Sequence, residues 1–443
     1  MLRIFRKICH KEKISAISVI RRTFLTEEYK CTESWNATNS SPLLNKINLS
    51  DFYNQLDQSY TSKGTISAID IDIFANAVND SHHLEELKDL LHKLRLSAET
   101  GNTLESTSHA TVRNFLQFGY VEELIEILKD PLNFGVFLDD YSANILLNEL
   151  LSKHNYDLAA DVASLVMLQE EFSSTITCTL CQYACYKYIL GYKPPEPITP
   201  VEDKTKKVEE IKIRVKYLRN PYFDDHFDIK DRYLLCGKTL AWITNKPNDN
   251  LCNNLRLIGW LAYKKYDKLL QLCQELTKST SFKLFNEVID IFNRDKEHSP
   301  ESDVKDIIEK SISVLSVAEK ISTETTLEKA ISIAVENAIN QSQNNDILTQ
   351  KQLFQSWVEI RKQKLEEQIN RLDRARRIQT IQQKQKQMQE EEQKLWFFEN
   401  EDKVDLEIEE KEKLTETNTA SKKTLTTKTN EQYIPPEILP KRN

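Results

Sequence analysis

The sequence predicts an all-α protein, an α-solenoid of helical hairpins followed by a long C-terminal helix. Glycine occurs only 7 times in 443 residues, whereas the average usage is about 7%. This scarcity disfavours the glycine-dependent phosphate loops of nucleotide-binding α/β folds and the tight turns of β-hairpins. Apolar residues recur with a helical period over most of the chain, and helical pairs recur at a spacing of about 34 residues. Such hairpins bury their wide apolar faces by stacking on their neighbours.

The N-terminal segment of the chain is basic and amphipathic. Residues 1–25 contain seven lysines and arginines and a single glutamate, a net charge of +6, with apolar residues between the bases. A basic, amphipathic, acid-poor start is typical of a mitochondrial transit peptide. We therefore expect residues 1–25 to be removed on import. An exposed basic arm is the alternative explanation.

The repeats are expected to occupy residues 63–192, after a polar, extended lead-in over 26–62. Corresponding positions are Thr111 and Ala143 in the first helices of two hairpins, and Tyr120 and Tyr156 in the second helices. The clearest hairpin pairs a helix over 140–152 with one over 156–170. The residues expected to form its repeat core are Tyr141, Asn144, Leu146, Leu147, Tyr156 and Ala159.

Proline and charge divide the rest of the chain. A proline-rich linker at 193–201 is followed by a second helical region at 202–345. Residues 350–398 contain no glycine or proline and predict one long helix. The composition of 400–443, rich in Glu, Lys and Thr, predicts an acidic disordered tail.

The long predicted helix carries a dense basic segment inside an acidic chain. Residues 361–386 hold nine bases against three acids, a net charge of +6. These bases are the candidate RNA-binding residues Arg361, Lys362, Lys364, Arg371, Arg374, Arg376, Arg377, Lys384 and Lys386. A helix of this length extends about 39 Å, so it could follow several phosphates, and arginine favours bidentate contacts with them.

The same helix has a coiled-coil-like seam, with apolar residues at intervals of seven. Val358, Leu365 and Leu372 define it. A solvated coiled-coil face is therefore the alternative to an RNA-binding rod.

One stretch carries a family resemblance. The pattern Asp139-x-Tyr141-x-x-Asn144-x-Leu146-Leu147, continued by Lys153-x-Asn155-Tyr156-x-x-Ala159, resembles a pentatricopeptide repeat. The longer run over 134–170 resembles the small-subunit mitochondrial ribosomal protein 27 family, as do the segments 234–238 and 354–357. The resemblance implies a ribosomal protein that supports mitochondrial translation.

Two departures from sequence-reading repeats bear on the mode of RNA binding. The position expected to face a base is Ile145, which has no donor for a base edge. The usual turn glycine is replaced by His154. We therefore expect a scaffold rather than a base-by-base reader.

No group of residues predicts catalysis, and we expect no enzyme, cofactor or metal. Cys178, Cys181 and Cys185 share one helical face, but nothing nearby supplies a fourth zinc ligand. Their simplest interpretation is a buried repeat face. The cluster Asp224-Asp225-His226-Phe227-Asp228 could hold a divalent ion, and this leaves a metal-dependent nuclease as a third reading.

The resemblance implies a structural component of the small subunit of the mitochondrial ribosome, in the matrix. Its expected partners are small-subunit ribosomal RNA and neighbouring mitochondrial ribosomal proteins, with no membrane and no small-molecule substrate. The alternative is a free pentatricopeptide factor for mitochondrial RNA stability or translation activation.

Overall fold

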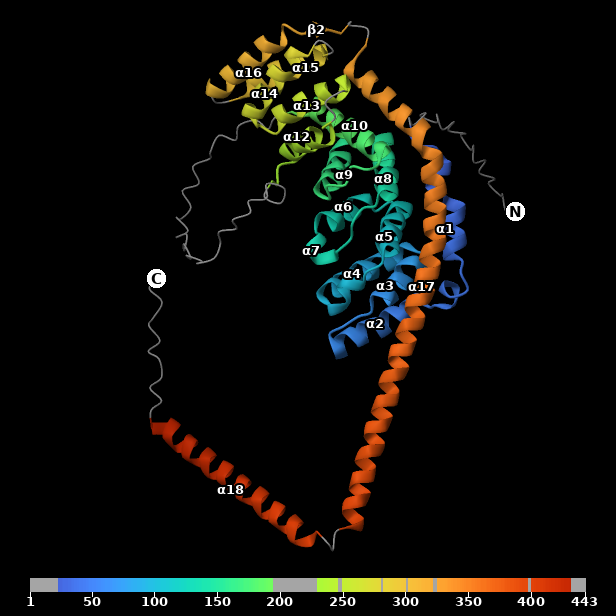
Figure 1. The fold of residues 1–443 in the computed structure, drawn as a ribbon, viewed down its shortest axis with the longest axis vertical. Coiled ribbons are helices and arrows are strands. Elements are labelled where there is room, and N and C mark those ends of the chain that lie inside the picture. The colour runs from blue at the N-terminus through green and yellow to red at the C-terminus, as the bar shows by residue number, and fades with distance from the viewer. Residues whose placement is uncertain are drawn as a thin grey trace, which may run out of the picture. The chain divides into compact units, whose positions relative to one another are not determined.

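The computed structural model describes residues 23–193, 229–245, 249–279, 282–299, 302–321, 325–396 and 400–431, and these are almost entirely helical (Figure 1). In this part of the chain the strands are β1 (Lys283–Leu284) and β2 (Glu319–Lys320), which pair in parallel. The prediction of an all-α fold is confirmed. The chain divides into two units, 1–362 and 363–443.

The N-terminal segment is folded, which corrects the prediction of an extended lead-in. It contains η1 (Glu27–Lys30), α1 (Thr32–Asn39), η2 (Leu44–Lys46) and α2 (Leu49–Lys63). Three of its large apolar side chains, Tyr29, Trp35 and Leu56, are buried in the common core. Because each reaches the common core, they fix a segment whose overall composition is polar.

The predicted transit peptide lies mostly outside the described residues, but its last three do not. The side chain of Leu25 is buried, and its backbone N–H donates to Asn148 Oδ1 at 3.1 Å. The ring of Phe24 packs on that of Tyr183, with centroids 5.0 Å apart. The folded body therefore includes Phe24 and Leu25, the last two residues of the predicted transit peptide.

The helices of the body pair along the chain into hairpins. The pairs are α3 (Ala68–Ala77) with α4 (Leu84–Leu96), α5 (Glu105–Phe118) with α6 (Val121–Lys129), α8 (Asp140–Ser152) with α9 (Tyr156–Leu168), α10 (Thr175–Gly191) with α12 (Arg232–Ile243), α13 (Asn250–Ala262) with α14 (Tyr266–Lys278), and α15 (Asn286–His298) with α16 (Ser302–Leu315). The short connecting helices are η3 (Ser81–His83), η4 (Ala98–Asn102) and α7 (Pro131–Phe134). Each first helix contacts the first helix of the next hairpin, from α3 through α5, α8, α10 and α13 to α15.

Caps and turns explain why the hairpins form where they do. The side chains of Asp139 and Ser174 accept from backbone N–H groups at the starts of α8 and α10. The turns between paired helices pass through left-handed residues, Gly119 (φ 86°), His154 (φ 57°) and Lys264 (φ 58°). The position of His154 thus does need the conformation that glycine adopts most easily.

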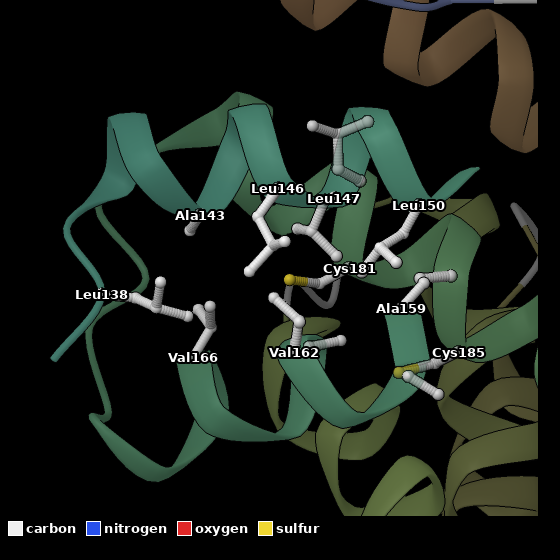
Figure 2. Packing of buried hydrophobic residues seen from close by; sticks show 14 of the residues in the cluster. Leu138, Ala143, Leu146, Leu147, Leu150, Ala159, Val162, Val166, Cys181 and Cys185 are labelled. Carbon is white, nitrogen blue, oxygen red and sulfur yellow. The ribbon is translucent and has the colours of Figure 1, made fainter. Parts of the chain in front are cut away.

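The interior of the clearest hairpin is a continuous apolar layer. In Figure 2, Leu146 and Leu147 of α8 lie opposite Val162 of α9, with Cys181 of α10 beside them. All four side chains are fully buried. The layer therefore joins one hairpin to the next, as neighbour stacking requires.

Helices α12 and α13 approach each other backbone to backbone. A Cβ on Gly237 would lie 2.4 Å from the backbone nitrogen of Tyr263, and one on Gly259 would lie 2.6 Å from that of Ala241. Both glycines are inside helices, where glycine otherwise lowers stability. Close packing is thus the reason for glycine at these two positions.

The C-terminal part consists of α17 (Leu327–Leu395) and α18 (Glu401–Glu431). The sequence predicts a helical region that ends at 345 and a separate long helix that begins at 350. Helix α17 instead runs through both without a break, because no glycine or proline interrupts it. Residues 401–431, for which the composition predicts disorder, form helix α18. Helix α18 contains no glycine or proline either, and pairs such as Glu409–Lys413 (3.3 Å) support it. In the described part of the chain, no helix has the length and apolarity needed to cross a membrane.

Candidate RNA interface

The first half of α17 packs along the first helices of the hairpins. Glu328 pairs with Lys187 of α10 at 3.0 Å. Further on, the ring of Phe354 lies 5.4 Å from that of His109 in α5. The last contact is made by Arg361, to Asp72 of α3. Helix α17 therefore passes α10, α5 and α3 in that order, opposite to their order in the sequence (Figure 1).

The folded N-terminal segment lies in the same interface. The hydroxyl of Tyr29 donates to Asp346 of α17 at 3.3 Å and accepts from Asn144 of α8 at 2.8 Å. Burial of the hydroxyl is the main cause that raises the pKa of Tyr29. It stays a neutral donor that joins three elements.

Aromatic rings and one arginine complete this interface. Trp35 of α1 lies 5.2 Å from Phe354, and the guanidinium of Arg113 lies 5.0 Å from the centroid of Trp35. Burial lowers the pKa of Arg113 to about 10, so it still carries its charge at neutral pH. The cation is held over the ring faces, where it is favoured electrostatically.

The structure separates Arg361 from the other candidate RNA-binding residues. Its Nε lies 2.6 Å from Asp72 Oδ2, and the two side chains are 4% and 0% exposed. A guanidinium buried in an ion pair cannot reach a phosphate without losing its partner. Arg361 is thus corrected from a surface contact to an anchor of α17, and the reason is burial.

The remaining eight bases lie on the exposed part of α17. They are Lys362, Lys364, Arg371, Arg374, Arg376, Arg377, Lys384 and Lys386, and all are exposed. Local acids pair with Lys364 (Glu367, 3.0 Å) and with Arg376 (Asp373, 3.9 Å). Exposed pairs of this kind are weak, so a phosphate can replace the acid. We call residues 362–386 the basic segment; its net charge is +5.

Apolar residues of the predicted coiled-coil seam are exposed in the same segment. Ile369, Leu372 and Ile381 are 55%, 51% and 55% exposed. They leave the basic segment with an apolar stripe beside its charges. The coiled coil itself stays a prediction.

The predicted repeat-core residues are buried or partly buried in the third hairpin, and Asn144 bonds to Tyr29 outside it. Asn144, Leu146, Leu147 and Ala159 are fully buried, and Tyr141 and Tyr156 pack against the core from the outside. Ile145, the position expected to face a base, is also buried at 7% exposure.

The sulfur cluster is buried, as its simplest interpretation requires. Cys181 and Cys185 have no exposed surface (Figure 2), and Cys178 is 6% exposed. A hydrogen bond to Cys236 and burial raise the pKa of the Cys185 thiol, so these groups stay protonated. Within the described residues no cluster of three or more possible ligands could hold a metal ion. The acidic cluster at 224–228 lies outside the described residues.

Sequence reasoning missed Asp72, the residue that holds the end of the anchored part of α17. The signal was present: Asp70 and Asp72 interrupt an otherwise apolar helix, Ala68–Ala77. A carboxylate in such a helix needs a buried partner.

The fold and this surface define a scaffold of α-helices with an exposed basic helix. A comparison with protein families names the group: the sequence of residues 1–387 matches the family described as mitochondrial 28S ribosomal protein S27. The match covers most of the chain, which therefore belongs to this family of mitochondrial small-subunit ribosomal proteins. It ends one residue after the basic segment, so α18 lies beyond it.

Proposed function

We propose that the chain is a structural component of the small subunit of the mitochondrial ribosome, in the matrix, and that its basic segment binds ribosomal RNA. The observation that supports this most is the run of eight exposed lysine and arginine side chains on one uninterrupted helix. Contacts with phosphates provide affinity without choice of sequence. A rigid helix can follow a folded RNA because it presents its charges at fixed intervals.

In this proposal the hairpins form an α-solenoid of the pentatricopeptide type that supports the basic segment and neighbouring ribosomal proteins. The contacts between successive first helices support a solenoid. The row of first helices is covered by the chain itself, through α1 and the first half of α17. This cover, together with the buried Ile145, argues against a reader of single-stranded RNA and thus against the free RNA factor.

The test is sedimentation of the tagged chain from a mitochondrial lysate, with and without charge reversal in the basic segment. We expect the wild-type chain to co-sediment with small-subunit ribosomal RNA. The variant with Arg371, Arg374, Arg376 and Arg377 all changed to Glu should dissociate at much lower salt. The matched control reverses the charge of Lys403, Lys411 and Lys413 in α18, and should sediment as the wild type does.

Two results would contradict the proposal. One is sedimentation only with free messenger RNA, which favours the alternative factor. The other is an unchanged salt tolerance in the Arg variant, which removes the basic segment from the mechanism.

A further inference from the structure

A second surface, far along the sequence from the basic segment, has the chemistry of a base-binding site. A pocket of about 480 Å³ lies where α10, α12 and α13 meet. Three partly exposed aromatic rings line it, from Phe172, Trp242 and Trp260, together with the side chains of Asn245 and Arg256. This volume is in the range of small-ligand pockets, and flat rings suit a flat occupant.

One cation lies over the indole of Trp260, and another lines the same pocket. The Nζ of Lys268, on α14, lies 4.9 Å from the centroid of the Trp260 ring. Arg256 lies one helical turn before Trp260 on α13, and its Nη1 donates to Asn245 Oδ1 at 3.4 Å. Arg256 is therefore held at the rim of the pocket by a weak neutral bond that a phosphate can replace.

The positive charge continues over the turn between α13 and α14. A shallow depression of about 370 Å³ is lined by Lys264, Lys265 and Lys268. Asp267 is the only acid among the described residues that line this depression and the aromatic pocket. The left-handed backbone at Lys264 keeps a charged side chain at a position where other hairpins have Gly119 or His154.

We propose that this pocket binds one unpaired base of an RNA strand, stacked on Trp260, while Arg256, Lys264 and Lys268 contact the phosphates on either side. Proteins usually bind unpaired nucleotides with aromatic rings that have lysine or arginine side chains beside them. An apolar protein side chain would fill the pocket but would leave the cations without partners. The inference shares with the proposed function the premise that the chain meets RNA, but it uses none of the residues 362–386.

The experiment measures binding of a fluorescent eight-nucleotide oligoadenylate to the full chain by anisotropy. We expect Trp260→Ala to weaken binding about tenfold or more, as loss of a stacking platform does. Trp260→Phe should keep most of the affinity, because it retains a ring. Trp396→Ala is the matched control, since Trp396 is 50% exposed and lies outside the pocket; it should bind as the wild type does.

Three further measurements keep this test independent of folding and of the basic segment. Arg256→Gln removes the charge but keeps a side chain of similar length in the pocket wall, and it should still weaken binding severalfold. An abasic oligomer of equal length should bind the wild-type chain and Trp260→Ala equally. In a chain with Arg371, Arg374, Arg376 and Arg377 all changed to Glu, Trp260→Ala should still weaken the binding of oligoadenylate about tenfold.

No loss of affinity from Trp260→Ala in that background overturns the inference and leaves the proposed function intact. Equal affinity for oligoadenylate and the abasic oligomer also overturns it, in favour of a protein occupant for the pocket. A preserved loss of affinity from Trp260→Ala with unchanged ribosome association in the Arg variant would instead overturn the proposed function alone.

Discussion

Arg361 of α17 donates from Nε to the Oδ2 of Asp72 in α3 at 2.6 Å, across 289 residues of sequence. The other carboxylate oxygen accepts from Thr107 at 3.0 Å and from the hydroxyl of Ser106. Both oxygens of this buried carboxylate therefore accept hydrogen bonds. The pair joins the first hairpin to α17 at the residue just before the basic segment.

Breaking this pair should cost more than replacing it. We expect Asp72→Leu or Arg361→Met to lower the free energy of unfolding by about 3–5 kcal/mol, because each leaves a buried charge alone. The double variant Asp72→Leu/Arg361→Met should lose less than the sum of the two. Urea unfolding of the four proteins measures this. Strict additivity would show that the two side chains do not interact in solution.

The contact between α12 and α13 should not tolerate a methyl group. Gly237→Ala places a Cβ against the backbone of α13, so we expect a loss of at least about 1–3 kcal/mol. Gly191→Ala is the matched control: no atom lies within 4 Å of its added Cβ, so its stability should stay the same or rise slightly. Thermal unfolding followed by circular dichroism compares them. Equal stability of the two variants would contradict the close approach.

The start of α8 should show a pH-dependent stability. Burial tends to raise the pKa of the Asp139 carboxyl, but His109 and the bonds from Ser142 outweigh it, and the pKa is lowered. Because the unfolded carboxyl titrates near about 3.9, this contribution is complete at neutral pH and is lost as the pH falls through the lowered folded value.

Asp139→Asn keeps the helix cap but not the charge, so it should be less stable than the wild type at pH 7. The difference should shrink as the pH falls below about 4. His109→Gln removes the partner of the carboxylate. In that background, Asp139→Asn should lower the free energy of unfolding at pH 7 by a smaller amount. Unfolding free energies across pH 2–7 measure both; a difference independent of pH would refute the contribution of the charge.

Import processing should leave Phe24 and Leu25 on the mature protein. A chain that begins at residue 23 should be as stable as the full-length chain. One that begins at residue 26 should be destabilised by about 2–5 kcal/mol, since it loses two core side chains. The mature N-terminus, read by mass spectrometry of protein from mitochondria, checks the boundary: cleavage after Leu25 would contradict it.

The sequence was sufficient for the features that depend on local pattern. Helical periodicity and the scarcity of glycine predict an all-α fold, and the third hairpin carries its own caps and turn. The family resemblance around 134–170 was confirmed over residues 1–387. These features depend on residues three or four positions apart, and such spacings can be read from a single sequence.

The failures concern residues whose partners are distant. The lead-in has a polar composition, which predicts an extended segment, yet Tyr29 and Trp35 contact α17, more than 300 residues away in the sequence. Arg361 has the same charge as Lys362 beside it, and only the position of Asp72 separates an anchor from a surface contact. Nothing local records such pairings.

The most direct test of the account is ultraviolet cross-linking of the chain in intact mitochondrial ribosomes, with identification of the cross-linked peptides and sequencing of the attached RNA. We predict cross-links from residues 362–386 to small-subunit ribosomal RNA. If peptides from this range carry no RNA while other parts of the chain do, the basic segment is not the RNA-binding surface.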